Sequence, residues 1–423
     1  MNLRRLSLPL LITLCLSFSC SCNRAGGNPD EGHNPMPSAL NEQSNEFAFR
    51  LYSQADRPGK NLFYSPYSIS SALSMVYGGA KGNTAAQIAE AMVFKLPEDQ
   101  QHAAFKALQE GLNELGKRKK AELNVANALF GAQRYEHLLV QDYLKLLNDY
   151  YYSDLYSLDF GKAQETADFI NNWVEKKTKD RIKNLISKDH IEASNDGLVL
   201  VNAIYFKGNW KNQFDPKQTL PDDFYTSSTQ RTIQNRKPVQ MMSLQGKFPY
   251  AELPGYQILE LPYAEEELAM LFVLPDEIDD LRDNLNAENF AFWQSELNTR
   301  EVKVYIPRFK FDLTLDGLTG MLKNMGMKDA FNADLADFSG IRKEEGGAGL
   351  YILDIIHKAF VEVNEEGTEA AAATGVVMAT KSAPSDIAPI PVFRADRPFL
   401  YLILHKPSNT VLFLGKLNDP PKL

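Results

Sequence analysis

The apolar residues in the N-terminal half of the chain recur at helical spacing. Two sets predict helices between residues 47 and 76; their members are Phe47, Leu51 and Tyr52, then Ile69, Ala72, Leu73 and Val76. Ser65 and Pro66 stand before the second set as an N-cap followed by a proline at the first helical position, and Gly78–Gly79 ends it. A third set predicts an amphipathic helix with charged residues on its other face; its apolar members are Ala167, Ile170, Trp173 and Val174.

From residue 198 onward the chain carries strand-like patterns. Residues 198–206 form a nearly continuous apolar run, which is typical of a buried central strand. Apolar residues alternate with polar residues or tyrosine across residues 302–306, and the apolar runs 399–404 and 411–414 flank a turn-rich segment that predicts a hairpin. Helices followed by strands predict an α+β fold, in a single domain that we place at residues 43–423.

Composition and charge place the chain among ordinary globular proteins. Of its 423 residues, 44% are hydrophobic and 23% are charged. The formal net charge of −9 argues against nucleic acid as a partner. One basic run, residues 117–120, is interpreted as a solvated helix end or turn, with a polyanion site as the alternative.

The first 42 residues have the pattern of an export signal followed by a tether. Two arginines precede a short apolar run, which is the order found in signal peptides, and we place this signal at residues 1–20. Cys20 and Cys22 each follow a serine, as at the lipid-attachment site of bacterial lipoproteins. Residues 21–42 are rich in glycine, proline and polar residues, so they cannot build a core and predict a flexible tether.

This N-terminal pattern predicts a bacterial lipoprotein that is exported and anchored at the cell envelope through lipid on Cys20 or Cys22. The membrane is otherwise not expected as a partner. Ordinary secretion, with cleavage nearby, is the alternative. Because all three cysteines lie in the first 22 residues, the fold is expected not to depend on disulfides. The membrane face that displays the protein stays open.

Catalytic and cofactor-binding motifs are absent from the sequence. There is no Gly-x-Ser-x-Gly nucleophile motif, no Gly-x-x-x-x-Gly-Lys-Ser/Thr phosphate loop and no His-Glu-x-x-His pair. We therefore predict no enzymatic activity, no metal and no cofactor. Among the six histidines, His357 stands inside an apolar run and is interpreted as a hydrogen-bonded histidine of the core.

Residues 364–374 carry conflicting local signals. A strand pattern over residues 355–363 leads into Thr368 and four alanines that fit a helix start, yet Gly375 would end that helix at once. If the segment is extended, one of its faces is small and uncharged and can lie against a core; this face comprises Thr368, Ala370, Ala372, Thr374 and Val376. Gly367 permits a backbone reversal before it. A mobile surface linker is the alternative interpretation.

Five segments are similar in sequence to segments of one known family; they are residues 61–69, 202–210, 306–309, 365–374 and 396–399. In order along the chain they resemble the second helix, the central sheet, a later strand, the reactive-loop hinge and the C-terminal strand pair of the serpins. The resemblance covers residues 43–418. It implies the serpin fold, an α+β architecture with three β-sheets, eight or nine helices and an exposed reactive loop.

The resemblance also implies which residues form the site. The hinge of the reactive loop corresponds to Glu366, Gly367, Thr368, Glu369, Ala370, Ala371, Ala372, Ala373 and Thr374. The shutter and breach of the central sheet correspond to Ser65, Ser68, Asn202, Trp210 and His357.

The mechanism implied by the resemblance is a suicide inhibition of serine proteases, and of cysteine proteases as a further class. The protease cleaves the loop, the hinge inserts into the central sheet, and the acylated protease is trapped. The family spacing of fourteen residues after the hinge glycine places the reactive bond at Lys381–Ser382, which suits a trypsin-like protease. The following segment is longer than in many relatives, so cleavage after Thr380 or Met378 stays open.

We expect a monomer whose partners are its target proteases. A non-inhibitory serpin that acts as a carrier or chaperone is the alternative, and a surface adhesin has no supporting motif. A charged, bulky or proline-bearing hinge would block insertion, and the inward face of this hinge has no such residue. The sequence does not say whether the natural target belongs to a host or to the same organism.

Overall fold

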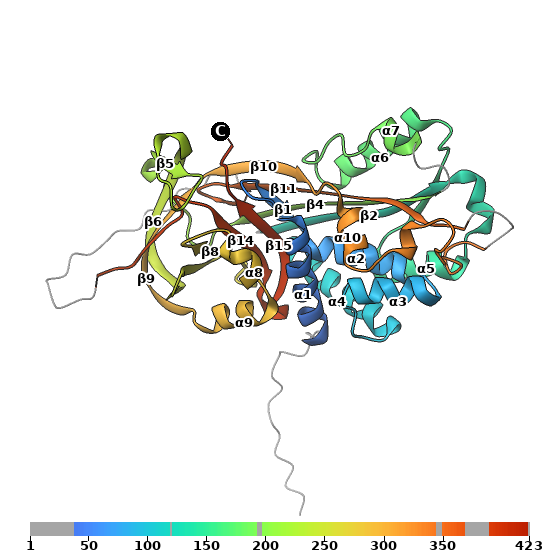
Figure 1. The fold of residues 1–423 in the computed structure, drawn as a ribbon, viewed down its shortest axis with the longest axis horizontal. Helices are drawn as coiled ribbons and strands as arrows, with labels where there is room; N and C mark the ends of the chain where they lie inside the picture. Colours follow the sequence, from blue (N-terminus) through green and yellow to red (C-terminus); the bar gives the residue numbers. More distant parts are fainter. Residues whose placement is uncertain (1–37, 119–120, 193–196, 344–348, 369–388, 422–423) are drawn as a thin grey trace, which may run out of the picture. The chain divides into compact units, whose positions relative to one another are not determined.

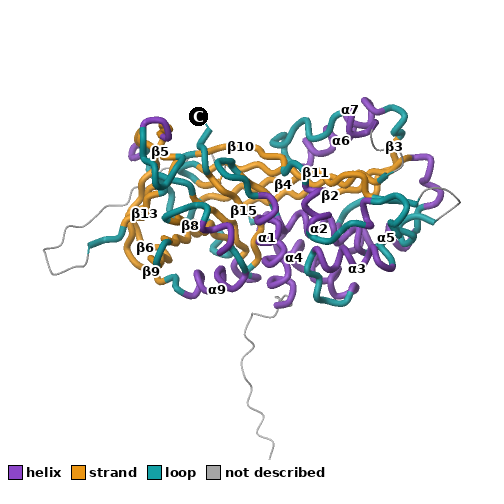
Figure 2. The backbone as a smooth tube through the Cα atoms, viewed as in Figure 1, coloured by secondary structure: helices purple, strands orange, loops and turns teal. Residues whose placement is uncertain are grey.

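The computed structural model describes residues 38–118, 121–192, 197–343, 349–368 and 389–421 (Figures 1 and 2). The α-helices among them are α1 (Ser38–Ala55), α2 (Pro66–Tyr77), α3 (Gly82–Ala91), α4 (Glu98–Lys117), α5 (Gln141–Tyr151), α6 (Ala163–Lys177), α7 (Lys188–Glu192), α8 (Asp280–Asn284), α9 (Ala287–Ser295) and α10 (Leu318–Asn324). The strands are β1 (Leu62–Tyr64), β2 (Ala121–Ala132), β3 (Leu155–Leu158), β4 (Leu198–Asn209), β5 (Leu220–Tyr225), β6 (Arg236–Leu253), β7 (Tyr256–Pro262), β8 (Leu268–Pro275), β9 (Asn298–Pro307), β10 (Phe309–Thr314), β11 (Ile352–Val363), β12 (Gly367–Thr368), β13 (Val392–Arg394), β14 (Phe399–His405) and β15 (Thr410–Leu417).

The smaller of the two sheets has six strands in the order β10-β11-β12-β4-β2-β3. Its central strands β4 and β11 also pair directly with each other, and this pairing is parallel. β4 is buried on both faces over most of its length, which explains why its sequence is a continuous apolar run rather than an alternating one.

The two faces of this six-stranded sheet pack against different layers. Leu200 and Ile204 of β4 belong to the main hydrophobic core, to which α1–α5 contribute. Val201 faces the opposite way and joins a smaller core with Ile170 and Val174 of α6. Figure 1 accordingly shows α6 and α7 along one face of the sheet and α2–α5 along the other.

The larger sheet joins two of the three sheets that the sequence predicts. Its order is β1-β15-β14-β8-β7-β6-β9-β13, with β5 paired to β6. The long strand β6 pairs with β5 over residues 236–241, with β9 over residues 241–250 and with β7 over residues 250–253. Within the described residues, hydrogen bonding therefore connects the predicted second and third sheets through β6.

Helix α2 begins where the sequence predicts. The Ser65 hydroxyl accepts a hydrogen bond from the Ser68 backbone N–H at 3.1 Å, and Pro66 is the first helical residue. The same hydroxyl donates to the Leu412 carbonyl at 2.6 Å, which ties the start of the helix to β15. Gly78 follows the last helical residue.

Other boundaries differ from the sequence prediction. Helix α1 begins at Ser38 and Leu40 is fully buried, so residues 38–42 belong to the folded unit and not to the tether. The described residues contain ten α-helices where eight or nine were expected, because α7 and α8 are short helices of five residues each. The predicted C-terminal hairpin is confirmed by the antiparallel pairing of β14 with β15.

No helix in the described part of the chain has the length and apolarity required to cross a bilayer.

Replacing Lys416 by methionine is expected to destabilise the fold by about 3–5 kcal/mol. The Lys416 ammonium and the Asp56 carboxylate form an ion pair whose side chains are only 1% and 4% exposed, so the substitution leaves a buried carboxylate without its cation. Urea unfolding measures the effect. The double variant Lys416→Met/Asp56→Leu should recover most of the loss, and equal stability of single variant and wild type would contradict the argument.

Candidate functional site

The hinge meets the six-stranded sheet between β4 and β11. We call the line along which these two strands adjoin the gap, although direct pairing closes most of it. The direct pairing of these strands ends at Tyr205 and Phe360. Beyond that point the two-residue strand β12 lies between them. Thr368 of β12 pairs antiparallel with Val363 of β11 on one side and with Gly208 of β4 on the other. The start of the hinge thus occupies one end of the gap, and direct strand pairing closes the rest.

Close packing holds this part of the hinge in the sheet. Thr368 is fully buried, and its hydroxyl lies 2.7 Å from the Tyr263 hydroxyl. Burial raises the pKa of Tyr263, so this phenol stays neutral and able to donate at physiological pH. A Cβ atom on Gly367 would lie 2.0 Å from the Gly208 carbonyl oxygen, which excludes every residue except glycine from this position.

The position of Thr368 corrects one expectation from the sequence. The mechanism implied by the resemblance has the hinge, Thr368 included, entering the sheet only after cleavage. In this structure of the uncleaved chain, Thr368 already pairs with both neighbouring strands.

Trp210 lies beside the hinge, at the open end of the gap. Its indole stacks on Tyr263 with 4.7 Å between ring centroids and 13° between ring planes. The indole N–H donates to the Asn364 carbonyl at 3.0 Å. The Asn364 side-chain oxygen in turn accepts from the backbone N–H groups of Glu366 at 3.1 Å and Gly367 at 3.2 Å, which shapes the turn between β11 and β12.

A buried carboxylate fastens the same turn to the larger sheet. Glu365 is 5% exposed and accepts a hydrogen bond from the Thr219 hydroxyl at 2.6 Å. Its other oxygen lies 3.3 Å from the guanidinium of Arg308, which stands between β9 and β10. The turn is therefore held by side chains that stand next to strands of both sheets.

A polar cluster lies under the closed part of the gap. His357 of β11 and Asn202 of β4 are directly paired residues, and the His357 Nδ1 atom bonds to the Asn202 side-chain oxygen. The Asn202 side-chain nitrogen donates to the Ser68 hydroxyl at 2.6 Å and to the side-chain oxygen of Asn127. The Ser65 backbone N–H donates to His357 Nε2 at 3.0 Å.

This arrangement defines the protonation state of His357. Because Nε2 accepts from a backbone N–H, the proton of the neutral ring is on Nδ1 and is donated to Asn202. Burial lowers the pKa of His357 to about 3, while the hydrogen bond with Asn202 acts in the opposite direction. A charged imidazole would lose the bond from Ser65, so the cluster is built for the neutral form.

The structure brings together four of the five residues predicted for the shutter and breach, namely Ser65, Ser68, Asn202 and His357 beneath the gap. Trp210 lies apart from them, at the open end of the gap. Glu366, Gly367 and Thr368 of the hinge are described. The other predicted positions lie outside the described residues; they are residues 369–374 of the hinge, Met378, Thr380, Lys381 and Ser382 of the loop, and Cys20 and Cys22.

The sequence analysis missed Asn127 and Tyr263, and it gave Glu365 no role although this residue begins the segment that resembles the hinge. Asn127 shares a face of β2 with Leu129 of the main core, so a polar residue at an inward-facing position was a usable signal. Nothing in the local sequence marks Tyr263 or the contacts of Glu365, because their partners are distant in the chain. Across the described ranges, no three or more His, Cys, Asp or Glu side chains gather as a metal site requires.

Comparison with known proteins agrees with this geometry. Residues 42–420 match the family described as serpin (serine protease inhibitor). Human Serpin B3 is 40% identical over 405 residues, which are 90% of this chain and 100% of that protein. The leukocyte elastase inhibitor of Equus caballus is 40% identical over 385 residues, 88% of this chain and 96% of that protein. A crystal structure of human thyroxine-binding globulin superposes with a TM-score of 0.78 at 30% identity, covering 90% of this chain and 99% of that one. The chain belongs to the serpin family.

The neutral histidine predicts a loss of stability in acid. A histidine in an unfolded chain has a pKa of about 6.5, and the pKa of His357 in the fold is about 3. As the pH falls, the unfolded chain therefore takes up the proton first. The contribution of His357 is complete above about pH 7 and falls by up to about 1.4 kcal/mol per pH unit as the pH decreases from there toward 3. Urea unfolding at pH 7.5 and pH 5 should show the decrease.

Two variants separate this effect from general acid sensitivity. His357→Gln keeps an acceptor for Ser65 but cannot titrate, and it should reduce the pH dependence. Part of the pH dependence of stability should remain in this variant, because burial also lowers the pKa of His102, to about 4. His190→Gln changes an exposed histidine and should leave the dependence as in the wild type. An unchanged slope in His357→Gln would show that another group is responsible.

Proposed function

We propose that this protein inhibits proteases as a suicide substrate, through insertion of its cleaved loop between β4 and β11. The observation that carries the proposal is the position of β12. The chain enters between two strands at one end of a gap, and those strands are otherwise paired with each other. Membership in the serpin family and similarity to a leukocyte elastase inhibitor support the same function.

The strand pairing indicates where the driving energy comes from. If residues beyond Thr368 follow β12 into the gap, one parallel pairing between β4 and β11 is replaced by two antiparallel pairings. Each backbone hydrogen bond gained contributes roughly 0.5–1.5 kcal/mol net. While both ends of the loop are attached, the loop cannot insert and these hydrogen bonds cannot form. Cleavage frees one end.

Two features resist premature opening. The bond between His357 and Asn202 joins the strands that must separate, and the Ser65 and Ser68 contacts anchor it from below. On the opposite face, Ile356 of β11 packs in the same cluster as α6. Both sets of contacts lie at the closed part of the gap, so they set the barrier that insertion has to cross.

We place the reactive bond at Lys381–Ser382. A lysine on the acyl side fits the specificity pocket of a trypsin-like serine protease, in which an aspartate pairs with the substrate cation. Thr380 and Met378 are secondary positions for proteases with other pockets.

A carrier function is the second candidate. It is favoured by the structural similarity to thyroxine-binding globulin, a protein whose name states that it binds a small molecule. The two candidates differ in their outcome with a protease. An inhibitor forms a denaturant-resistant complex, and a carrier is cut and releases the protease.

Thr368→Arg is expected to convert the inhibitor into a substrate. Thr368 is fully buried and its hydroxyl meets the Tyr263 hydroxyl, so burying a guanidinium there costs several kcal/mol. The arginine should therefore displace β12 from the gap before cleavage. Insertion then has to bury the guanidinium at its first step and slows, and hydrolysis of the acyl-enzyme releases active protease. Electrophoresis under denaturing conditions, with the stoichiometry of inhibition, measures the change.

Thr368→Ser is the matched control, because it keeps the hydroxyl that meets Tyr263. It should trap protease with the stoichiometry of the wild type. Glu369→Arg, on the opposite face of an extended hinge, should also have little effect. Stable complexes formed by Thr368→Arg at wild-type stoichiometry would refute insertion at this site.

Trypsin is expected to release a C-terminal fragment that begins at Ser382. Mass spectrometry of the complex measures its N-terminus. Lys381→Ala should abolish trypsin inhibition while inhibition of an elastase, through Thr380 or Met378, persists. A fragment that begins elsewhere would move the reactive bond.

We also propose that the protein is exported and held at a bacterial cell envelope by lipid on Cys20 or Cys22. The native protein should partition into the detergent phase, and the variant with both cysteines changed to serine should not. A wild-type protein found in the aqueous phase would favour simple secretion.

A further inference from the structure

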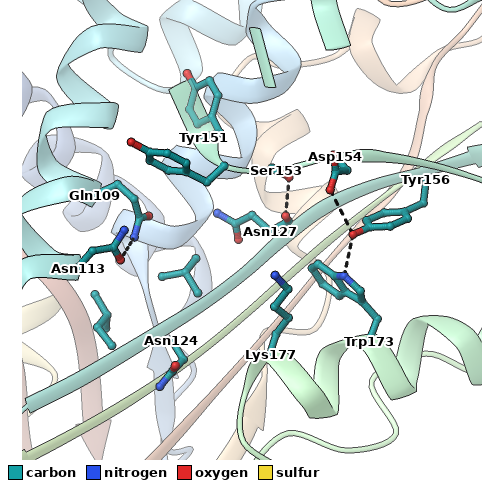
Figure 3. Close-up of a pocket in the computed structure, with 13 residues that line it drawn as sticks. Gln109, Asn113, Asn124, Asn127, Tyr151, Ser153, Asp154, Tyr156, Trp173 and Lys177 are labelled. Carbon is teal, nitrogen blue, oxygen red and sulfur yellow. Dashed lines mark hydrogen bonds between the residues drawn. The ribbon is translucent and has the colours of Figure 1, made fainter. Parts of the chain in front are cut away.

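The outer edge of β2 is open along most of its length. β3 pairs with β2 only over residues 129–132, so residues 121–128 have no partner strand on that side within the described chain. A cavity of about 250 Å³ follows this open edge, which is slightly smaller than the roughly 300 Å³ at which ligand sites begin (Figure 3). It is distinct from the gap between β4 and β11.

The backbone of β2 directs hydrogen-bonding groups into this cavity. The Leu129 N–H donates outward to the Asp154 carbonyl, and the Asn127 carbonyl accepts from the Ser153 hydroxyl at 2.7 Å. The pairing of β2 with β4 has no register shift, so Leu123 and Val125 share this orientation by alternation. Both line the cavity. Their N–H and C=O groups therefore face it without a partner strand among the described residues.

Polar, charged and aromatic side chains line the cavity, and the one carboxylate among the described lining residues, Asp154, accepts a hydrogen bond from the Tyr156 hydroxyl at 3.4 Å. Figure 3 shows Gln109 and Asn113 of α4 on one side of the strand and Trp173 and Lys177 of α6 on the other. The Lys177 ammonium lies 5.8 Å from the centre of the Trp173 ring and has no carboxylate within ion-pair distance in the described chain. The side-chain nitrogen of Asn124 is buried and has no hydrogen-bond partner among the described residues.

We propose that this groove binds an extended acidic peptide, which adds to β2 as a strand in line with β3. Strand addition satisfies the outward N–H and C=O groups of Leu123 and Val125, as it does at other exposed sheet edges. Alternate side chains of the peptide then face α6, where a carboxylate meets Lys177. The opposite face of the peptide meets the amide side chains of α4.

The size and chemistry of the groove favour a short peptide over a compact ligand. The open edge between Leu123 and Asn127 is about 13 Å long at ~3.3 Å per residue, which matches about four peptide residues. A backbone offers donors and acceptors with the spacing of β2 itself, and the free amide of Asn124 adds a donor on the α6 side.

The probe is the capped peptide acetyl-Thr-Glu-Thr-Glu-Thr-Glu-amide, added to the full-length native protein. Binding should change the fluorescence of Trp173 in a saturable way. It should also slow hydrogen exchange of the Leu123 and Val125 amides, measured by NMR. The amides of Asn124 and Ala126 face β4 and should show no comparable change. Neither measurement depends on protease inhibition.

Peptide and protein variants test the two parts of the recognition. N-methylation of alternate peptide amides removes the donors without altering the protein and should abolish binding. Lys177→Glu should weaken binding of the Thr-Glu peptide by about tenfold and strengthen binding of the matched Thr-Lys peptide. Val125→Pro removes an outward-facing N–H that β4 does not use, so the sheet should persist while binding is lost.

Specific results would overturn the proposal. One is peptide binding that protects amides of β4 and β11, because the peptide would then occupy the central gap. Another is unchanged exchange at Leu123 and Val125 at saturating peptide. A third is concentration-dependent self-association that the peptide displaces, because a second copy of the chain would then be the occupant.

Discussion

The direct parallel pairing of β4 with β11 is the constraint on which the rest of the site depends. It closes most of the gap in the six-stranded sheet, and it leaves only the end that β12 fills. The bond between His357 and Asn202 crosses this pairing. A neutral histidine suits that position because burial lowers its pKa to about 3 and a backbone N–H occupies its second nitrogen.

The two ends of the gap are built differently, and this difference gives the site a direction. At the open end, the Trp210–Tyr263 stack, the Asn364 turn and the buried Glu365 hold the chain so that Thr368 lies between the strands. At the closed part, strand pairing continues and α6 covers the outer face. Under the proposed mechanism, chain inserted after cleavage starts at the open end, because there the described sheet already has a third strand between β4 and β11.

The groove beside β2 follows from the same architecture at another edge. In the same six-stranded sheet, the strand β2 is covered by β3 only in part. Exposed edge groups of this kind are commonly covered or charged in native proteins. Here they face a cavity with amide, aromatic and ammonium side chains, which is a setting suited to binding.

Much of the fold and part of the site could be predicted from the sequence. Ser65 and Pro66 specify the start of α2, and the uninterrupted apolar run of β4 records burial on both faces, because capping and burial act on residues close in sequence. The small inward face of the hinge beyond Thr368 lies outside the described residues and stays a prediction. The tertiary structure alone decided that Thr368 already lies in the sheet, that Asn127 joins the cluster under His357, and that β6 connects two expected sheets. These features depend on contacts between residues far apart in the chain, such as Ser65 with His357, and no local pattern encodes the partner of a buried polar group.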